Sequence, residues 1–372
     1  MQVNHLSIHN LRNLNNPSLS FSPQLNIIYG PNAAGKSSLL EALYILGNGR
    51  SFRTTKHNKV INDDFNDFTI FAKLQSSDTR HQLGFSRQRS GETQIKLNTE
   101  PVKRLSTLAK LSPIQILSPE QYDLLVKGPS SRRKQLDWGV FHVEHSVLGL
   151  WQKCHKIILQ RNQLLKRQAS YQDVSVWDKQ LVTLSEQVTQ LRQAYCDKIT
   201  PLFSQYCQDF LGQYNLSLQL YPGWSDRKDI GLQSIYKEQF EKDKQLGYTQ
   251  SSIHKADLRF LLDKTKRAGD YLSRGQQKLL ITAFKLAQLK VMQEFGSQSP
   301  LFLLDDIGAE LDAKHQQQLL KVLANQPPNQ QIFITCVHLE PLKPLIEQYD
   351  DVRMFHVEHG HIKEVSTDAA AL

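Results

Sequence analysis

The stretch "YGPNAAGKSSLL", residues 29–40, places two glycines and a lysine between an apolar segment and a helical pattern. The order Gly30, four residues, Gly35, Lys36, Ser37 matches G-x-x-x-x-G-K-S, the phosphate-binding loop (P-loop) that holds nucleotide phosphates with backbone N–H groups. "LNIIY" before it predicts a short buried strand, and "SSLLEALYIL" after it has apolar residues at helical spacing. The chain therefore has the strand–loop–helix order that a P-loop requires, and we expect a bound nucleotide.

The side chains of such a loop have separate roles. We expect the Lys36 ammonium to reach the outer phosphates and the Ser37 hydroxyl to ligate Mg²⁺, while the glycines let the backbone approach the ligand. The expected nucleotide contacts from this loop are Gly30, Pro31, Asn32, Ala33, Ala34, Gly35, Lys36, Ser37 and Ser38.

Composition limits the class of protein. A chain of 372 residues suggests two or three domains or lobes, and a net charge of +9 is compatible with nucleic-acid binding without requiring it. The sequence has no secretory leader pattern and no run of eighteen apolar residues, so we expect a cytoplasmic protein with no membrane contact. The four cysteines lack metal-ligand spacing, which predicts reduced, buried thiols.

The texture of the sequence changes along the chain. Residues 1–125 predict strands with one helix, in a mixed sheet with an antiparallel appendage. Residues 132–212 are helical and predict two antiparallel helices packed on each other, the second with a heptad seam. The seam residues are Trp177, Leu181, Leu184, Val188, Leu191 and Tyr195. Residues 220–255 are turn-rich, with no assigned role.

The last part of the chain returns to an α/β pattern, with a helix from Asp312 and a final strand "QIFITCV". We therefore expect an α/β fold with two parts. The nucleotide-binding lobe combines 1–128 with 290–372, and an inserted helical lobe spans 129–289.

The segment "LFLLDDIGAELD", residues 301–312, supplies the carboxylates that a P-loop lacks. An apolar strand that ends in Asp305 can present this carboxylate to Mg²⁺ and its water shell. Asp306, one residue later, can orient or deprotonate an attacking water. We expect Asp305 to bind the metal and Asp306 to be catalytic, together with Lys36.

The segment "YLSRGQQKLL", residues 271–280, opens a second long helix. Ser273, Gly275 and Gln276 would display a hydroxyl and N–H groups at the positive end of the helix dipole. This pattern predicts a second contact with a phosphate.

Together these stretches resemble the ATP-binding-cassette (ABC) ATPases of the chromosome-maintenance branch, and more closely still the RecF family of bacterial recombination-repair proteins. The resemblance also covers "LSIHNLRNL", "GNGRSFR" (47–53), residues 117–145 and the closing "FHVEHG". It implies an ABC-ATPase head with a signature motif at 272–276 and a D-loop at 309–312. In such heads two ATP molecules are sandwiched between two subunits, with the signature of one facing the P-loop of the other.

The resemblance also implies a function. It implies a homodimer that forms on ATP and Mg²⁺, binds DNA where single and double strands meet at gaps, and acts with RecO and RecR to load the RecA recombinase. Asp306 stands where many relatives have Glu, which predicts slow hydrolysis. His338 is displaced from the usual switch position, and Gln115 is the candidate lobe-linking glutamine.

Three other classes share parts of this pattern. A chromosome-structuring (SMC-type) head has long coiled-coil arms, whereas the seam here spans about three heptads, roughly 30 Å. A nuclease of the overcoming-lysogeny type needs an added domain after residue 312, where too little chain follows. The long stretch between Lys36 and Ser273 and the basic charge disfavour the ATPase subunit of a transporter.

Two further motifs remain open. "FHVEH" occurs at 141–145 and 355–359, in different predicted secondary structure, so we interpret it as local packing and not as a metal site. "SSRRK", residues 130–134, is either a DNA-contact patch or a solvated face.

Overall fold

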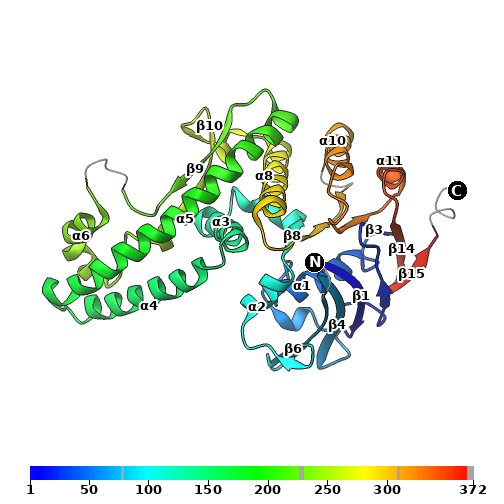
Figure 1. Ribbon diagram of the computed structural model, residues 1–372, viewed down its shortest axis with the longest axis horizontal. Helices are drawn as coiled ribbons and strands as arrows, with labels where there is room; N and C mark the ends of the chain where they lie inside the picture. The colour runs from blue at the N-terminus through cyan, green and yellow to red at the C-terminus, as the bar shows by residue number, and fades with distance from the viewer. Residues whose placement is uncertain (77–78, 226–229, 308–310, 367–372) are drawn as a thin grey trace. The chain divides into compact units, whose positions relative to one another are not determined.

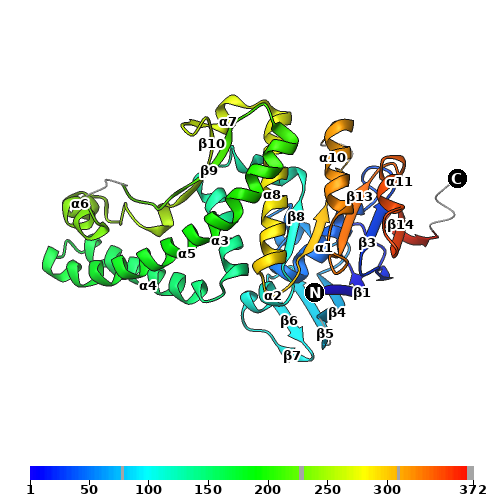
Figure 2. The same cartoon turned by 45° about the horizontal axis from the view of Figure 1, so that its top comes forward.

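The structure, a computed structural model, describes residues 1–76, 79–225, 230–307 and 311–366. Its contacts divide the chain into two compact units, Met1–Tyr122 with Arg274–Leu372, and Asp123–Ser273 (Figures 1 and 2). Helix α8, Arg274–Phe295, falls in the first unit, whereas the expected boundary at 289 placed most of it in the helical lobe. Its buried face packs on strand β8 of the first unit, which explains the difference.

The first unit contains a six-stranded sheet in the order β15-β14-β3-β13-β12-β8. Its strands are β3 (Leu25–Tyr29), β8 (Ile114–Leu117), β12 (Leu301–Leu304), β13 (Ile332–Cys336), β14 (Val352–Glu358) and β15 (His361–Val365). All neighbours are parallel except β15. The central strands β3, β13 and β12 are buried along nearly their whole length, as expected for strands covered on both faces. The prediction that β13 is the final strand is wrong, because β14 follows it and pairs with β3.

The predicted antiparallel appendage is confirmed as a second six-stranded sheet, in the order β2-β1-β4-β5-β6-β7. Its strands are β1 (Gln2–His9), β2 (Ser18–Ser20), β4 (Asp67–Ser76), β5 (Thr79–Gln88), β6 (Thr93–Leu97) and β7 (Glu100–Pro101). Alternating residues of β1 and β4 are buried, so one face of this sheet enters the core. Helix α1, Lys36–Asn48, shares that core with both sheets.

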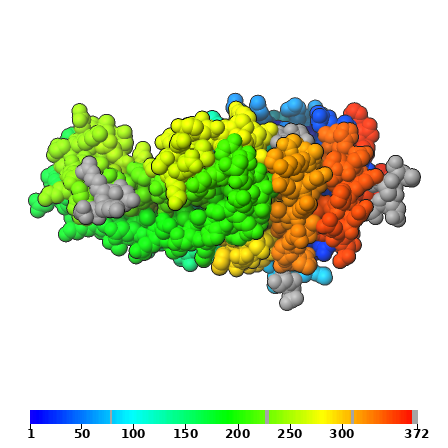
Figure 3. All heavy atoms as spheres, turned by 90° about the horizontal axis from the view of Figure 1, so that it is seen from above, coloured from blue at the N-terminus to red at the C-terminus, as the bar shows by residue number. Residues whose placement is uncertain are grey.

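Shorter helices complete the first unit. They are η1 (His57–Lys59), α2 (Leu105–Leu111), η2 (Pro119–Leu124, which crosses into the second unit), α10 (Ala313–Ala324), η4 (Glu340–Leu342) and α11 (Lys343–Ile346). The predicted helix start at Asp312 is confirmed, since its carboxylate accepts a hydrogen bond from the His315 N–H at 3.0 Å and caps α10. The space-filling view shows α10 beside the C-terminal segment of the same unit (Figure 3).

The second unit is built on helices and a small sheet. Its elements are α3 (Gly128–Val143), α4 (Val147–Lys166), α5 (Tyr171–Leu211), β9 (Leu216–Tyr221), α6 (Leu232–Leu246), η3 (Ile253–Lys255), β10 (Asp257–Leu262), β11 (Lys266–Arg267) and α7 (Ala268–Tyr271). The predicted helix pair is confirmed, because α4 and α5 run antiparallel and pack along each other (Figure 1). Leu181, Val188 and Tyr195 of the heptad seam are buried core residues.

Residues 220–255 were expected to be turn-rich, but they contain the fifteen-residue helix α6. Leu232, Ile235, Tyr236 and Phe240 are buried at helical spacing, so the apolar period was present in the sequence. The segment was predicted to be turn-rich because turn residues flank this helical period on both sides.

The basic cluster at 130–134 is not a solvated face as a whole, because two of its three cations have partners within the protein, and its role as a DNA-contact patch stays a prediction. Arg132 is 9% exposed and forms a two-point ion pair with Asp257, with both N–O distances 2.9 Å. Arg133 donates to the backbone oxygen of Ala256 at 2.8 Å, and of the three basic side chains only Lys134 is exposed. These arginines therefore hold α3 against β10.

The two "FHVEH" copies lie in different secondary structure, as predicted. One ends α3, where His142 is buried, and the other lies at the end of β14. Within the described ranges, no group of three His, Cys, Asp or Glu side chains is arranged to hold a metal ion. No described helix is long and apolar enough to cross a bilayer.

Candidate nucleotide-binding site

The loop between β3 and α1 has a backbone that only glycine can follow at two positions. Gly30 has φ 147° and Gly35 has φ 121°, both disfavoured for residues with a side chain. A Cβ atom at Gly30 would lie 2.2 Å from the backbone oxygen of Val357 in β14. The C-terminal strands also hold the loop through Gly360, whose N–H donates to the Ala34 oxygen at 2.9 Å.

Lys36 is the first residue of α1 and is 7% exposed. Its ammonium donates to the backbone oxygens of Gly30 and Pro31, at 2.8 and 2.9 Å. Burial lowers the pKa of Lys36, and the negative charge of Asp306 opposes that shift. The lysine is thus fixed at the loop, close to the positive end of the α1 dipole.

A cluster of oxygen atoms lies beside this lysine. The Ser37 hydroxyl donates to Asp305 Oδ1 at 2.8 Å, and the Thr335 hydroxyl donates to the same oxygen at 2.8 Å. Burial raises the pKa of Asp305, and these two hydrogen bonds oppose the rise. The atoms meet because β3, β13 and β12 are adjacent parallel strands whose carboxyl ends lie at one edge of the sheet.

Sequence reasoning missed Thr335. Its hydroxyl also accepts a hydrogen bond from the Asp306 N–H at 2.8 Å, so it bridges Asp305 and Asp306. Asp306 has φ 54°, a left-handed conformation that Asp tolerates better than most residues. The sequence signal that could have identified Thr335 is a hydroxyl residue near the end of β13, the strand beside β12, after which Asp305 and Asp306 follow.

A cavity of about 650 Å³ opens over the P-loop, a size suited to a small-molecule ligand. Asp306 borders it together with six predicted residues of the loop. Its lining comprises Arg12, Asn13, Asn32, Ala33, Gly35, Lys36, Ser37, Ser38, Arg53, Lys59, Ile61, Asn62, Asp63, Asp64 and Asp306. Sequence reasoning did not select Arg12 or Arg53, which add positive charge to the lining of this cavity.

Glu41 of α1 holds these arginines in place and was also missed. It is 0% exposed, and both its oxygens accept hydrogen bonds from Arg12, at 2.8 and 2.9 Å. The Ser51 hydroxyl also donates to Glu41, and Arg53 lies 3.9 Å from it. The helix that begins at Lys36 therefore also positions the two arginines that line the same cavity.

The remaining predicted residues lie in other places. Gly275 and Gln276 are in the first turn of α8, which begins at Arg274 as expected, and Ser273 is the last residue of the second unit. The expected D-loop at 309–312 includes residues 309 and 310, which lie outside the described residues.

Gln115 and His338 have contrasting surroundings. Gln115 is buried in β8, and its amide donates to the Lys285 oxygen and to Gln288 Oε1 of α8, both at 3.3 Å. His338 is exposed, two residues after β13. Their roles as lobe-linking and switch residues stay predictions.

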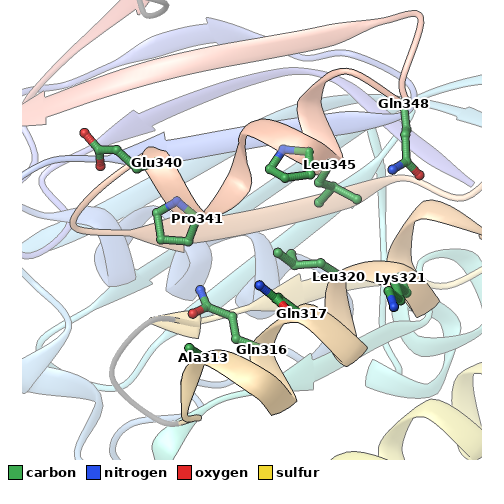
Figure 4. A pocket seen from close by; sticks show the side chains of 10 residues that line it. Ala313, Gln316, Gln317, Leu320, Lys321, Glu340, Pro341, Leu345 and Gln348 are labelled. Atoms are coloured by element: carbon green, nitrogen blue, oxygen red, sulfur yellow. The ribbon is translucent and has the colours of Figure 1, made fainter.

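A different cavity, of about 440 Å³, lies between α10 and the segment of η4 and α11. Figure 4 shows Gln316 and Leu320 of α10 on one side, with Pro341 and Leu345 opposite. Lys321 and Glu340 are the charged residues of this lining, which includes no P-loop residue. This cavity is therefore not part of the nucleotide-binding site.

Comparison with known proteins agrees with this geometry. Residues 2–363 match the family model described as RecF/RecN/SMC N terminal domain. Two curated proteins, each called DNA replication and repair protein RecF, are similar over 97% of this chain and 99% of their own length. The protein from Psychromonas ingrahamii is 40% identical, and that from Shewanella piezotolerans is 39% identical.

Solved structures give the same picture. The recombination mediator protein RecF-ATP in the RecFOR pathway superposes with a TM-score of 0.82 and 26% identity, over 98% of both chains. An Smc head bound to the C-winged helix domain of ScpA has a TM-score of 0.62 and 14% identity, over 100% of this chain and 99% of its own. The second likeness concerns the fold alone, and it agrees with the predicted ABC-ATPase head.

Proposed function

The chain belongs to the RecF family, within the wider RecF/RecN/SMC group, and from this membership we propose that it is an ATP-dependent DNA-binding protein of recombinational repair. ATP drives two copies together, the dimer binds DNA where single and double strands meet at gaps, and slow hydrolysis releases it. RecR and RecO are the proposed partners, and loading of the RecA recombinase is the proposed outcome.

The P-loop cavity supports ATP as the ligand. The loop offers backbone N–H groups, the fixed Lys36 ammonium and a helix N-terminus to phosphate oxygens. The Ser37 hydroxyl and the Asp305 carboxylate, 2.8 Å apart, form the hard oxygen donor set that suits Mg²⁺. We propose that these two residues hold the ion, which when bound neutralises phosphate charge.

The position of Asp306 supports a role in hydrolysis. It borders the cavity, and its backbone is held by Thr335, so its carboxylate can orient an attacking water and accept its proton. The side chain is one methylene shorter than Glu, which favours slow turnover. A slow ATPase suits a switch that stays closed on DNA.

Ser273, Gly275 and Gln276 supply the second phosphate contact in this proposal. They join the end of the second unit to the first turn of α8, where N–H groups are displayed. We propose that this signature contacts ATP held by the P-loop of the other subunit. Dimerisation is then required for hydrolysis.

The observation that carries the proposal is the Lys36–Ser37–Asp305 arrangement in a RecF-type head, and Lys36→Ala tests it. The variant should lose ATP-dependent dimerisation and ATP-stimulated binding to gapped DNA, because a methyl group cannot pair with phosphate oxygens. Lys363→Ala, an exposed lysine on β15, is the matched control. Equilibrium sedimentation and DNA-binding titrations with and without ATP provide the readouts. Unchanged nucleotide affinity in Lys36→Ala would refute the assignment.

A further inference from the structure

The first unit has a small cavity of about 170 Å³ between the segment that follows α1 and the antiparallel sheet. Arg50 and His57 come from that segment, Phe68 from β4 and Arg87 from β5. We call it the Arg50–Arg87 cavity. Its full lining is Ile45, Arg50, Ser51, Thr54, Thr55, His57, Val60, Phe68 and Arg87.

The described residues that line this cavity include two guanidinium groups and an imidazole, but no carboxylate. Arg87 is fixed by neutral acceptors, since its Nε donates to Thr93 Oγ1 at 2.8 Å and a terminal nitrogen donates to the Gly49 oxygen at 3.1 Å. Its guanidinium also lies over the Phe85 ring, 5.4 Å from the centroid. Burial lowers the pKa of Arg87. A partly buried cation with such partners is stabilised by an anion.

The dimensions and walls of the cavity restrict the class of anion. Its volume is below the range typical of sites for whole small-molecule ligands, about 300–1,000 Å³. Two arginines at one site match the bidentate recognition of phosphate, and Ile45, Val60 and Phe68 add an apolar wall that suits a sugar carbon. We propose that the Arg50–Arg87 cavity binds a backbone phosphate of DNA. This inference rests on the proposed function.

Neighbouring cations extend the cavity along the surface. Gly49, next to Arg50, lies against Leu105 at the start of α2, because a Cβ atom at Gly49 would be 2.5 Å from the Leu105 side chain. Lys103 and Arg104 immediately precede that leucine, and both are exposed. A DNA backbone with one phosphate in the cavity would therefore meet further positive charge nearby.

The cavity is connected to the nucleotide site through one short segment. Ser51 donates to Glu41 and accepts from the N–H groups of Arg53 and Thr54, at 2.9 and 3.1 Å. Arg50 lines the Arg50–Arg87 cavity, and Arg53, three residues later, lines the P-loop cavity. ATP and a DNA phosphate would thus contact the same rigid turn.

Arg50→Gln and the double variant with Arg87→Gln test the proposal in the full chain with ATP. Arg80→Gln is the matched control for Arg50→Gln, since Arg80 is exposed on β5 and its substitution removes the same single charge. The double variant should lower the slope of log affinity against log salt for duplex DNA by about 0.9, the value for one phosphate contact. The affinity of the double variant for duplex DNA at low salt should be about tenfold lower than that of the parent. Arg50→Gln alone should show a smaller loss of affinity. Arg80→Gln should behave like the parent, and Arg50→Lys should keep the slope.

Fluorescence anisotropy of labelled duplex DNA across a salt series measures these values, and ATP affinity checks that each variant is folded. If the parent binds DNA and Arg50→Gln binds with the parent's slope and affinity, the inference is wrong while the proposed function stands. If the parent does not bind DNA, both are wrong. Inorganic phosphate is the second probe. If phosphate shifts the melting temperature of the parent but not of Arg50→Gln, while their DNA affinities are equal, the cavity is a free-anion site and the inference is overturned.

Discussion

The hydroxyl of Thr335 is expected to decide whether Asp306 is positioned for hydrolysis, and Thr335→Val removes it at nearly constant volume. The threonine is 0% exposed and makes two hydrogen bonds of 2.8 Å, one to Asp305 and one from the Asp306 N–H. Loss of the first, to a charged group, costs about 1.5–3 kcal/mol, and the buried N–H left without a partner costs about 1–3 kcal/mol. If about 3 kcal/mol of this combined cost appears as lost stabilisation of the transition state for hydrolysis, ATP turnover falls about 100-fold.

Single-turnover ATP hydrolysis measures this effect, and equilibrium nucleotide binding separates it from affinity. Affinity should change less than about threefold, because Thr335 does not line the P-loop cavity and Ser37 still contacts Asp305. Thr335→Ser keeps the hydroxyl and should retain most of the turnover. Parent-like turnover in Thr335→Val would show that the bridge does not position Asp306. Equal losses in both variants would assign the effect to packing of the missing or altered methyl group.

Three further outcomes are expected. Ser273→Arg should bind ATP as a monomer, and sedimentation should show that it does not dimerise. Mixing it with Lys36→Ala should restore at most one competent site per dimer. Normal dimerisation of Ser273→Arg would refute a signature contact in trans. Burial lowers the pKa of His142 to about 3, so below about pH 6.5 this histidine binds a proton in the unfolded chain but not in the folded one. The free energy of unfolding should therefore fall by about 2 kcal/mol between pH 7 and pH 5. Urea unfolding should show this fall in the parent and a smaller one in His142→Leu. Arg132→Ala should lower the free energy of unfolding by about 3–5 kcal/mol because it leaves Asp257 buried and unpaired, whereas Lys134→Ala should not; equal stability would contradict the buried pair.

Local sequence patterns predicted the elements that place the site. Strand β3, the P-loop and α1 follow from an apolar run, two glycines and a 3.6-residue period, all within residues 25–48. Asp305 was predictable because a carboxylate that ends an apolar strand can reach the same sheet edge as the P-loop.

The missed residues depend on contacts between segments far apart in the sequence. Thr335 meets Asp305 only because β13 lies beside β12, and Arg12, in the loop after β1, meets Glu41 of α1. Nothing in the composition of 130–134 shows that Arg132 has a carboxylate partner on β10. Such pairs are set by tertiary packing, which a single sequence does not display.

Strand β3 has a consequence for how this protein is made. Its two hydrogen-bonding neighbours, β13 and β14, are both translated long after it, and the P-loop backbone is closed by Val357 and Gly360. During synthesis β3 therefore leaves the ribosome as an apolar strand with both edges unpaired. Its partner strands, β13 and β14, leave the ribosome much later. Exposed strand edges promote aggregation, and pairings between distant segments form slowly. ATP cannot stabilise this intermediate, because the loop that would bind it is closed by Val357 and Gly360, which are translated long after the loop itself.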